Sequence, residues 1–171
     1  ARSWVRGGHR IFDRLARLCK PTIAVLNGHA FGGGLELASA CDIRIMHPKA
    51  RVALPEAGVG ITPGWSGTQR LQRLLPEPVI KEMALFGRQI EAHRAAQLGF
   101  VAEVNEDPMG VAKEIAAKVS ALSPRAVEIT KNMIHAGAGE DTGALIEALG
   151  SGAIAPTDDK REGVTAFQDK R

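Results

Sequence analysis

Residues 20–42 read KPTIAVLNGHAFGGGLELASACD, and this stretch decides the fold. Its first part, Thr22–Leu26, is apolar, rich in β-forming residues and closed by an Asn-Gly turn signal, which predicts a buried strand. The three consecutive glycines that follow, residues 32–34, predict a loop. Leu35–Ala40 consists of helix-forming residues. A strand, a glycine loop and a helix in quick succession indicate an α/β protein.

The sequence on both sides of this stretch extends the alternation of strands and helices. Apolar residues at helical spacing, with arginines on the opposite side, predict an amphipathic helix that ends near Cys19. Pro55–Gly67 is rich in glycine and proline and predicts a structured loop. We expect strands over 42–47, 50–54 and 100–104, and helices over 68–75, 79–86, 91–98, 111–122, 125–136, 141–150 and 158–170. This order indicates an α/β core followed by a helical carboxyl-terminal part.

The composition is that of an ordinary globular protein. Of 171 residues, 44% are hydrophobic and 24% are charged, and 22 Lys and Arg against 19 Asp and Glu give a net charge of +3. The basic residues are dispersed, without interleaved aromatic residues, so the sequence does not favour nucleic-acid binding. No apolar run reaches the length of about 18 residues that a membrane span needs, so we expect no membrane association.

The cysteines and histidines predict no metal site. Cys19 and Cys41 fit neither a metal-binding pair nor a secreted disulfide framework, and the histidines are scattered along the chain. Free thiols of this kind are typical of a reducing compartment. We therefore expect a cytoplasmic protein.

The glycine loop is the first candidate for chemistry. A backbone N–H at the start of a helix has no partner within the helix and lies at the positive end of its dipole, so Gly33 or Gly34 could stabilise an anion or an oxyanion. The alternative is that the three glycines only permit a tight turn. Their spacing does not match the dinucleotide-binding fingerprint.

Two glutamates are the next candidates. Glu36 lies about one helical turn beyond Gly33 and is surrounded by apolar residues, although a glutamate there could simply complement the helix dipole. Glu56 follows Pro55 at the end of a predicted strand, where the alternative is a turn start on the surface. If the two carboxylates met near an oxyanion site, they would form a coherent acid/base pair.

Four segments of the sequence together resemble one known family. Residues 20–42, 55–56, 60–71 and 156–171 are similar, in the right order, to signatures of the enoyl-CoA hydratase/isomerase, or crotonase, family. The resemblance runs essentially from end to end. It implies a spiral of ββα turns with carboxyl-terminal helices that build trimers, commonly stacked into hexamers. We accordingly expect residues 1–105 to be part of the spiral core, with the active-site glutamates, and residues 106–171 to be a helical oligomerisation region.

The resemblance implies a reaction and roles for the candidate residues. Family members bind acyl-CoA thioesters and polarise the thioester carbonyl with two backbone N–H groups. Gly33 matches the second of these donors, and Gly32 beside it is expected to contact substrate. Glu36 and Glu56 match the two glutamates with which hydratases hold a water molecule and handle its protons during addition to the 2,3 double bond. Gly64 matches the residue whose backbone helps to seat that water.

The resemblance also implies how coenzyme A is bound. Phe167 and Lys170 match positions that contact the CoA of a neighbouring subunit, where a lysine suits phosphate. No metal or redox cofactor is needed, since coenzyme A is part of the substrate. The expected partners are therefore an acyl-CoA thioester and further copies of the chain.

Two other functions stay open at this stage. Both glutamates are retained, which favours a 2-enoyl-CoA hydratase, but an isomerase or another CoA-thioester enzyme of the same family could use the same groups. An RNA-binding relative ranks lower. Similarity of residues 34–44 to methylglutaconyl-CoA hydratases leaves branched acyl groups open.

Two features depart from the family pattern. Trp65 stands where a small residue is usual, and if its ring faces the acyl pocket we expect a preference for short or compact acyl groups. Relatives carry further residues before the position that matches Ala1, including the loop that offers the first oxyanion N–H. We therefore expect the 171 residues to be part of a longer polypeptide that would aggregate or be inactive without the rest.

Overall fold

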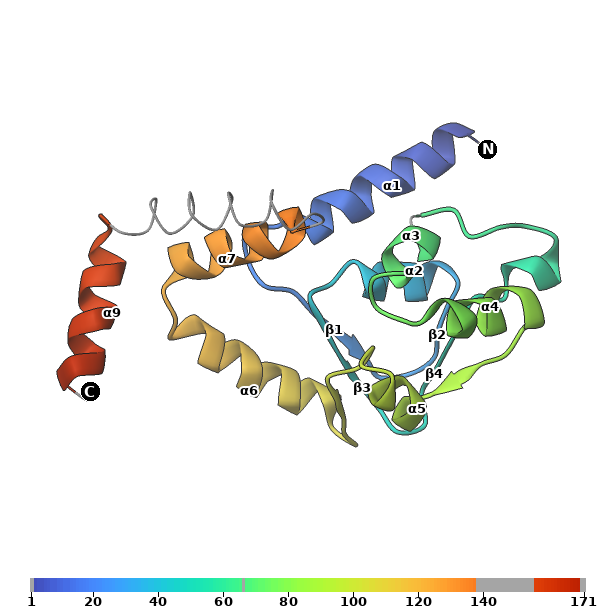
Figure 1. The fold of residues 1–171 in the computed structure, drawn as a ribbon. Helices are drawn as coiled ribbons and strands as arrows, with labels where there is room; N and C mark the ends of the chain where they lie inside the picture. The colour runs from blue at the N-terminus through green and yellow to red at the C-terminus, as the bar shows by residue number, and fades with distance from the viewer. Residues whose placement is uncertain (1, 66, 138–155, 170–171) are drawn as a thin grey trace. The chain divides into compact units, whose positions relative to one another are not determined.

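The computed structural model describes residues 2–65, 67–137 and 156–169 (Figure 1). The chain forms two compact units, one from Ala1–Leu18 and Thr22–Glu114, the other from Cys19–Pro21 and Ile115–Arg171. The helix expected over 141–150 lies outside the described residues. The expected functional division at residue 105 stays a prediction.

Both sheets belong to the first unit. Its elements in chain order are α1 (Arg2–Ala16), β1 (Ile23–Leu26), β2 (Ala30–Phe31), α2 (Gly33–Ser39), β3 (Ile43–Met46), β4 (Arg51–Ala53), the 3-10 helix η1 (Glu56–Val59), α3 (Gly67–Leu71), α4 (Glu77–Phe86), β5 (Ile90–Glu91), α5 (Ala92–Gln97) and β6 (Glu103–Val104). Helix α6 (Pro108–Ser120) begins in the first unit and ends in the second, which also contains α7 (Pro124–Ala136) and α9 (Asp158–Asp169).

Strands β1 to β4 alternate between two sheets, which makes this part of the chain a spiral. One sheet has the order β1-β3-β6 and is parallel, and the other has the order β2-β4-β5, with β2 and β4 parallel. Ile23 pairs with Ile43 and Ala30 pairs with Val52, so each turn of the chain places one strand in each sheet beside the strand of the turn before. This arrangement agrees with the expected ββα spiral.

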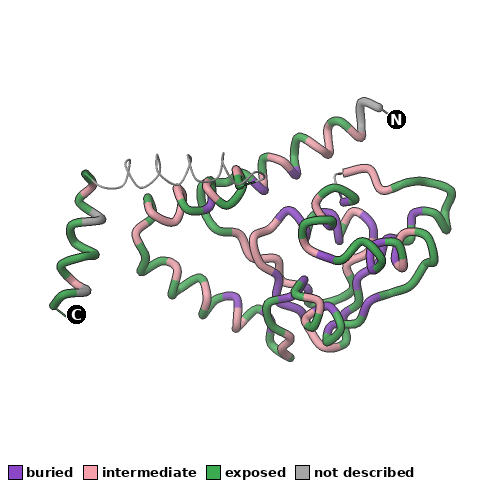
Figure 2. The backbone as a smooth tube through the Cα atoms, viewed as in Figure 1, coloured by how far each residue is buried: buried purple, intermediate pink, exposed green. Residues whose placement is uncertain are grey.

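The core of the first unit lies between these strands and helix α2. Leu35 of α2, Ile45 and Met46 of β3 and Val52 of β4 are fully buried, and buried segments in Figure 2 concentrate on these elements. Burial of such side chains removes apolar surface from water and stabilises each by about 1.5–3 kcal/mol. This core fixes the position of α2, which contacts β2 and α3.

The structure differs from the predicted elements at several boundaries. Helix α2 begins at Gly33, inside the predicted glycine loop. Within this loop only Gly32 has a positive φ, +52°, so the sharp turn before the helix requires this one glycine. The two-residue strands β2 and β5 were not predicted, since they are too short to show a period of two. The segment Pro55–Gly67, predicted to lack regular structure, contains η1.

Candidate active site

Helix α2 carries Glu36 into the interior of the first unit. The side chain is 2% exposed, although it is charged. Its Oε1 accepts the backbone N–H of Trp65 at 2.8 Å and that of Gly67 at 2.9 Å. These two donors hold the carboxylate in one orientation. A carboxylate that only complemented the helix dipole would not need these two N–H donors.

Glu56 lies at the start of η1 and is also buried. It is 7% exposed, so the alternative of a surface turn is wrong. A Cβ built on Gly32 would lie 2.8 Å from Glu56 Oε1, which places this oxygen against the glycine loop. Its other oxygen, Oε2, has no hydrogen-bond partner within the described residues. A buried carboxyl oxygen without a protein partner is available to a bound molecule or to a proton.

The two glutamates interact electrostatically. Burial raises the pKa of the Glu56 carboxyl above its ordinary value, a backbone hydrogen bond within Glu56 opposes the rise, and the charge of Glu36 adds to it. Like charges in one site resist ionising together, so Glu36 contributes to the raised pKa of Glu56.

The glycine loop lies between these carboxyl groups and Trp65. Gly33 is the first residue of α2, so its N–H has no acceptor within the helix. A Cβ on Gly33 would lie 2.7 Å from Trp65 Cζ3, so the indole packs directly on the α-carbon of Gly33. Gly64 precedes Trp65, whose N–H reaches Glu36. Five of the predicted site residues thus lie in one cluster: Gly32, Gly33, Glu36, Glu56 and Gly64.

Sequence reasoning missed one member of this cluster. Gly67 donates its N–H to Glu36 Oε1, and a Cβ on it would lie 2.5 Å from Glu36 Cγ. The signal was present, because Gly67 ends the glycine-rich loop and begins α3. Its role depends on a contact between residues 31 apart in the sequence, which local pattern cannot predict.

Comparison with known proteins assigns the family. The profile of the enoyl-CoA hydratase/isomerase family matches residues 4–171. The chain belongs to this family. It is 42% identical over 168 residues to a short-chain-enoyl-CoA hydratase of Clostridium acetobutylicum, covering 96% of this chain and 64% of that protein. It is 38% identical over 175 residues to a crotonyl-CoA hydratase of Syntrophomonas wolfei, covering 100% of this chain and 67% of that protein.

The crotonase fold is confirmed by solved structures of the enoyl-CoA hydratase/isomerase family. The crystal structure of an enoyl-CoA hydratase from Bacillus anthracis superposes with a TM-score of 0.94 at 37% identity, covering 99% of this chain and 66% of that one. The chain thus spans about two thirds of the length of the family members that it matches.

Two predicted CoA-contacting residues remain, both near the carboxyl end of the sequence. Phe167 belongs to α9 in the second unit, and Lys170 lies outside the described residues. Within the described ranges, no three His, Cys, Asp or Glu side chains are grouped as metal ligands. Of the helices that the structure describes, none is long and apolar enough to cross a membrane.

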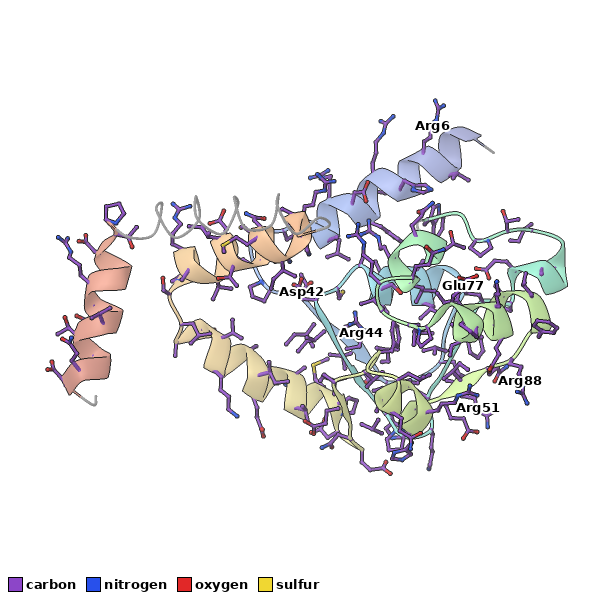
Figure 3. All side chains as sticks on the ribbon, viewed as in Figure 1. Arg6, Asp42, Arg44, Arg51, Glu77 and Arg88 are labelled. Atoms are coloured by element: carbon purple, nitrogen blue, oxygen red, sulfur yellow. The ribbon has the colours of Figure 1, made fainter. Side chains whose placement is uncertain are left out.

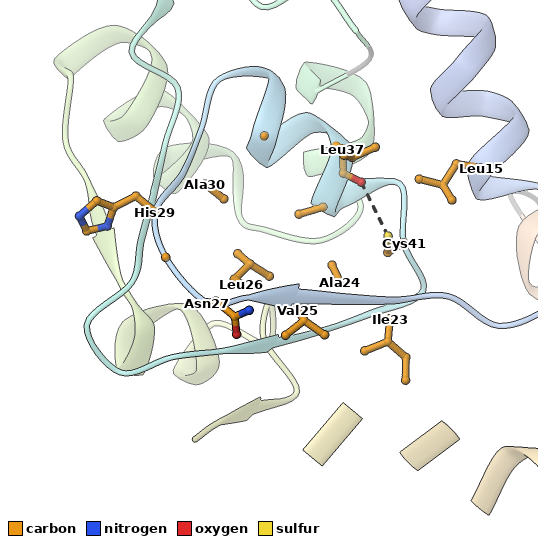
Figure 4. Close-up of a pocket in the computed structure, with 13 residues that line it drawn as sticks. Leu15, Ile23, Ala24, Val25, Leu26, Asn27, His29, Ala30, Leu37 and Cys41 are labelled. Carbon is orange, nitrogen blue, oxygen red and sulfur yellow. Dashed lines mark hydrogen bonds between the residues drawn. The ribbon is translucent and has the colours of Figure 1, made fainter. Parts of the chain in front are cut away.

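A hollow of about 390 Å³ lies along β1 and α2 (Figure 4). Its lining is mostly apolar side chains of these two elements, including Leu26 and Leu37, and Cys41 Sγ donates to the Leu37 carbonyl oxygen at its rim. Neither glutamate lines it. We therefore treat it as distinct from the cluster around Glu36 and Glu56, and we assign no chemistry to it.

Proposed function

We propose that the protein hydrates 2-enoyl-CoA thioesters to 3-hydroxyacyl-CoA, with Glu36 and Glu56 as the acid/base pair and the Gly33 N–H in the oxyanion hole. The observation that carries the proposal is the pair of buried, electrostatically coupled carboxyl groups beside the first turn of α2. The names of the two relatives, a short-chain-enoyl-CoA hydratase and a crotonyl-CoA hydratase, support the substrate class.

The two environments suggest a division of roles. Glu36, oriented by two backbone N–H groups, accepts a proton from water as its oxygen attacks C3 of the enoyl group. Electrons move toward the thioester carbonyl, and the Gly33 N–H stabilises the resulting enolate oxygen. Glu56, whose raised pKa favours the protonated form, supplies a proton to C2. One water is consumed and no electrons are gained or lost, so the reaction requires no redox cofactor.

The test is hydration of crotonyl-CoA by the protein expressed from the complete reading frame that contains these residues. Glu36→Gln and Glu56→Gln should each lower kcat by about 10²–10⁴-fold, the range typical of general acid/base groups. The control is Glu114→Gln, at an exposed position of α6. Near-normal rates in either site variant, with the control unchanged, would reject the assignment.

The same assay separates hydration from isomerisation. Isomerisation moves one proton between two carbons, whereas hydration needs a base for water and an acid for carbon at once. Two coupled carboxyl groups therefore favour hydration. A protein that converts 3-enoyl-CoA to 2-enoyl-CoA faster than it hydrates crotonyl-CoA would be an isomerase instead.

We further propose that residues 106–171 form trimers or hexamers and that Phe167 and Lys170 contact the CoA of a neighbouring subunit. Light scattering should give three or six copies. Lys170→Ala should raise the KM for crotonyl-CoA while kcat changes little, because loss of a phosphate contact weakens ground-state and transition-state binding equally. Neither Cys19 nor Cys41 forms a disulfide bond within the described residues, which supports a reducing compartment such as the cytoplasm.

A further inference from the structure

We propose that Trp65 determines which acyl groups the site accepts, because helix α1 holds its indole against Gly33 as a fixed wall of the acyl pocket. The inference rests on the proposed function, since it assumes that the thioester carbonyl binds at Gly33. It adds a size limit to that function: the preferred substrates carry short acyl chains.

The indole spans the space between α1 and α2. A Cβ on Gly8 of α1 would lie 2.0 Å from both Cδ1 and Nε1 of Trp65, so this position accommodates the ring only because it is glycine. At the opposite edge of the indole, Cζ3 and Cε3 would lie 2.7 Å and 3.1 Å from a Cβ on Gly33. The ring therefore occupies the volume that side chains at both glycines would fill.

Further contacts hold α1 in this position. The ring of Phe12 meets the indole edge to face, with centroids 5.5 Å apart, and Phe12 is 8% exposed. Such a pair contributes about 0.5–1.5 kcal/mol beyond the area that it buries. The next residue of α1, Asp13, forms an ion pair with Arg70 of α3. An indole held by packing and by a neighbouring ion pair cannot easily move aside for a longer ligand.

The backbone of Trp65 links this wall to the acid/base pair. Its N–H donates to Glu36 Oε1 at 2.8 Å, while its ring packs on Gly33. The same residue thus orients the carboxylate and bounds the space beside the oxyanion donor. Because the side chain is only half-buried, part of its surface is left for an acyl group to contact.

The first experiment compares crotonyl-CoA with decenoyl-CoA as substrates. Trp65→Ala keeps the backbone N–H but removes the wall, so the ratio of kcat/KM for decenoyl-CoA to that for crotonyl-CoA should rise about tenfold or more over the wild type. Trp65→Phe, a smaller ring that retains the packing against α1, should raise the ratio by less. It also keeps the test decisive if the alanine variant does not fold.

The second experiment uses two adjacent glycines of α1 as a matched pair. Gly8→Ala places a methyl group against the indole, whereas a Cβ on Gly7 meets nothing within 4 Å. Both changes replace glycine by alanine within a helix, so both improve the intrinsic helix propensity by the same amount, about 1 kcal/mol. Gly8→Ala should lower kcat/KM for crotonyl-CoA at least about tenfold, and Gly7→Ala should leave it unchanged. In the Trp65→Ala background, Gly8→Ala should lose its effect, because the coupling runs through the ring.

The outcomes separate this inference from the function on which it rests. A wild type that hydrates neither thioester overturns the proposed function. A wild type that hydrates crotonyl-CoA, together with Trp65 variants of unchanged chain-length ratio, overturns the role of Trp65 alone. Equal effects of Gly8→Ala in the presence and absence of the indole would also overturn it.

Discussion

The N–H of Gly67 donates to Oε1 of Glu36 at 2.9 Å, and the two residues approach so closely that a Cβ on Gly67 would lie 2.5 Å from Glu36 Cγ. Any side chain at position 67 would therefore displace either the carboxylate or the start of α3. Since Glu36 is buried, it has little room to move. The glycine is required by a close approach of backbone to side chain.

We expect Gly67→Ala to impair catalysis more than stability. The methyl group pushes Glu36 away from its two N–H donors, and a displacement of about 1 Å at a reacting group can cost about 10²-fold in rate. The measurement is kcat for crotonyl-CoA hydration beside the midpoint of urea unfolding. Gly58→Ala is the control, because a Cβ there meets nothing within 4 Å. Equal rates for the two variants would show that Glu36 is not held in place by this contact.

A second pair of glycines separates backbone strain from contact with the site. Gly32 and Gly60 both have positive φ, +52° and +73°, so alanine at either strains the backbone. The strain is about 1–2 kcal/mol at Gly60, which has left-handed helical angles, whereas Gly32 has ψ of −123° and lies outside that region. Only at Gly32 would the new Cβ also meet Glu56, at 2.8 Å from Oε1. We therefore expect Gly60→Ala to lower the free energy of unfolding with kcat intact, and Gly32→Ala to lower both. If Gly60→Ala lost as much activity as Gly32→Ala, strain alone would explain the loss.

The local pattern around the glycine loop predicted the elements of the site well. Thr22–Leu26 and Leu35–Ala40 correspond to β1 and α2, because a compact apolar strand and a run of helix formers are decided by nearby residues. The apolar neighbours of Glu36 in the same helix marked it as a candidate, although a glutamate that only complements the helix dipole stayed an alternative. The family resemblance, which rests on several segments in order, predicted the crotonase fold that the solved structures confirm.

Contacts between distant residues could not be predicted in this way. The contact of Gly67 with Glu36 and that of Gly8 with Trp65 depend on how α1, α2 and α3 pack, which the sequence near each glycine does not determine. The burial of Glu56 could not be predicted from the local sequence either, since proline followed by glutamate is typical of a surface turn. Tertiary packing overrides such local preferences wherever a functional group must be enclosed.

The raised pKa of Glu56 predicts a specific dependence of stability on pH. The folded state binds this proton more strongly than the unfolded chain, where the pKa is about 4.3. The resulting stabilisation is fully present below the unfolded pKa and is lost as pH rises through the raised folded pKa. Relative to wild type, Glu56→Gln should therefore become progressively more stable across this window, as measured by urea unfolding at a series of pH values.

Glu77 provides a control, because its pKa is shifted in the opposite direction. A hydrogen bond from Lys81 and the charge of that residue lower the pKa of the exposed Glu77 carboxyl. Its stabilisation is present above the unfolded pKa and is lost as pH falls through the lowered folded pKa. Glu77→Gln should thus become relatively less stable as pH rises. Parallel pH profiles for the two variants would contradict the raised pKa of Glu56.

Replacing the buried Arg44 should lower the stability of the protein and leave its catalytic rate unchanged. The side chain is 5% exposed, and its position on β3 is labelled in Figure 3. Its Nε donates to the Phe100 carbonyl oxygen and its Nη1 to that of Cys41 at 2.9 Å, so it joins β3 to the segment before β6. Burial lowers the pKa of the guanidinium, and the charges of Cys41 and Asp42 act in the opposite direction. The guanidinium also donates to the carbonyl oxygens of Ala38 and Asp42.

Arg44→Met should lower the free energy of unfolding by about 2–4 kcal/mol, because buried carbonyl oxygens lose donors at a cost of about 1–3 kcal/mol each. Part of that loss is offset, since the variant no longer buries a charge. None of these contacts involves the two glutamates, so kcat should stay within about twofold of wild type while the protein is folded. Arg73→Met, at an exposed position, should change stability by less than about 0.5 kcal/mol. If Arg44→Met leaves the free energy of unfolding unchanged, the freed carbonyl oxygens must find other donors. The link between β3 and the segment before β6 would then rest on apolar packing alone.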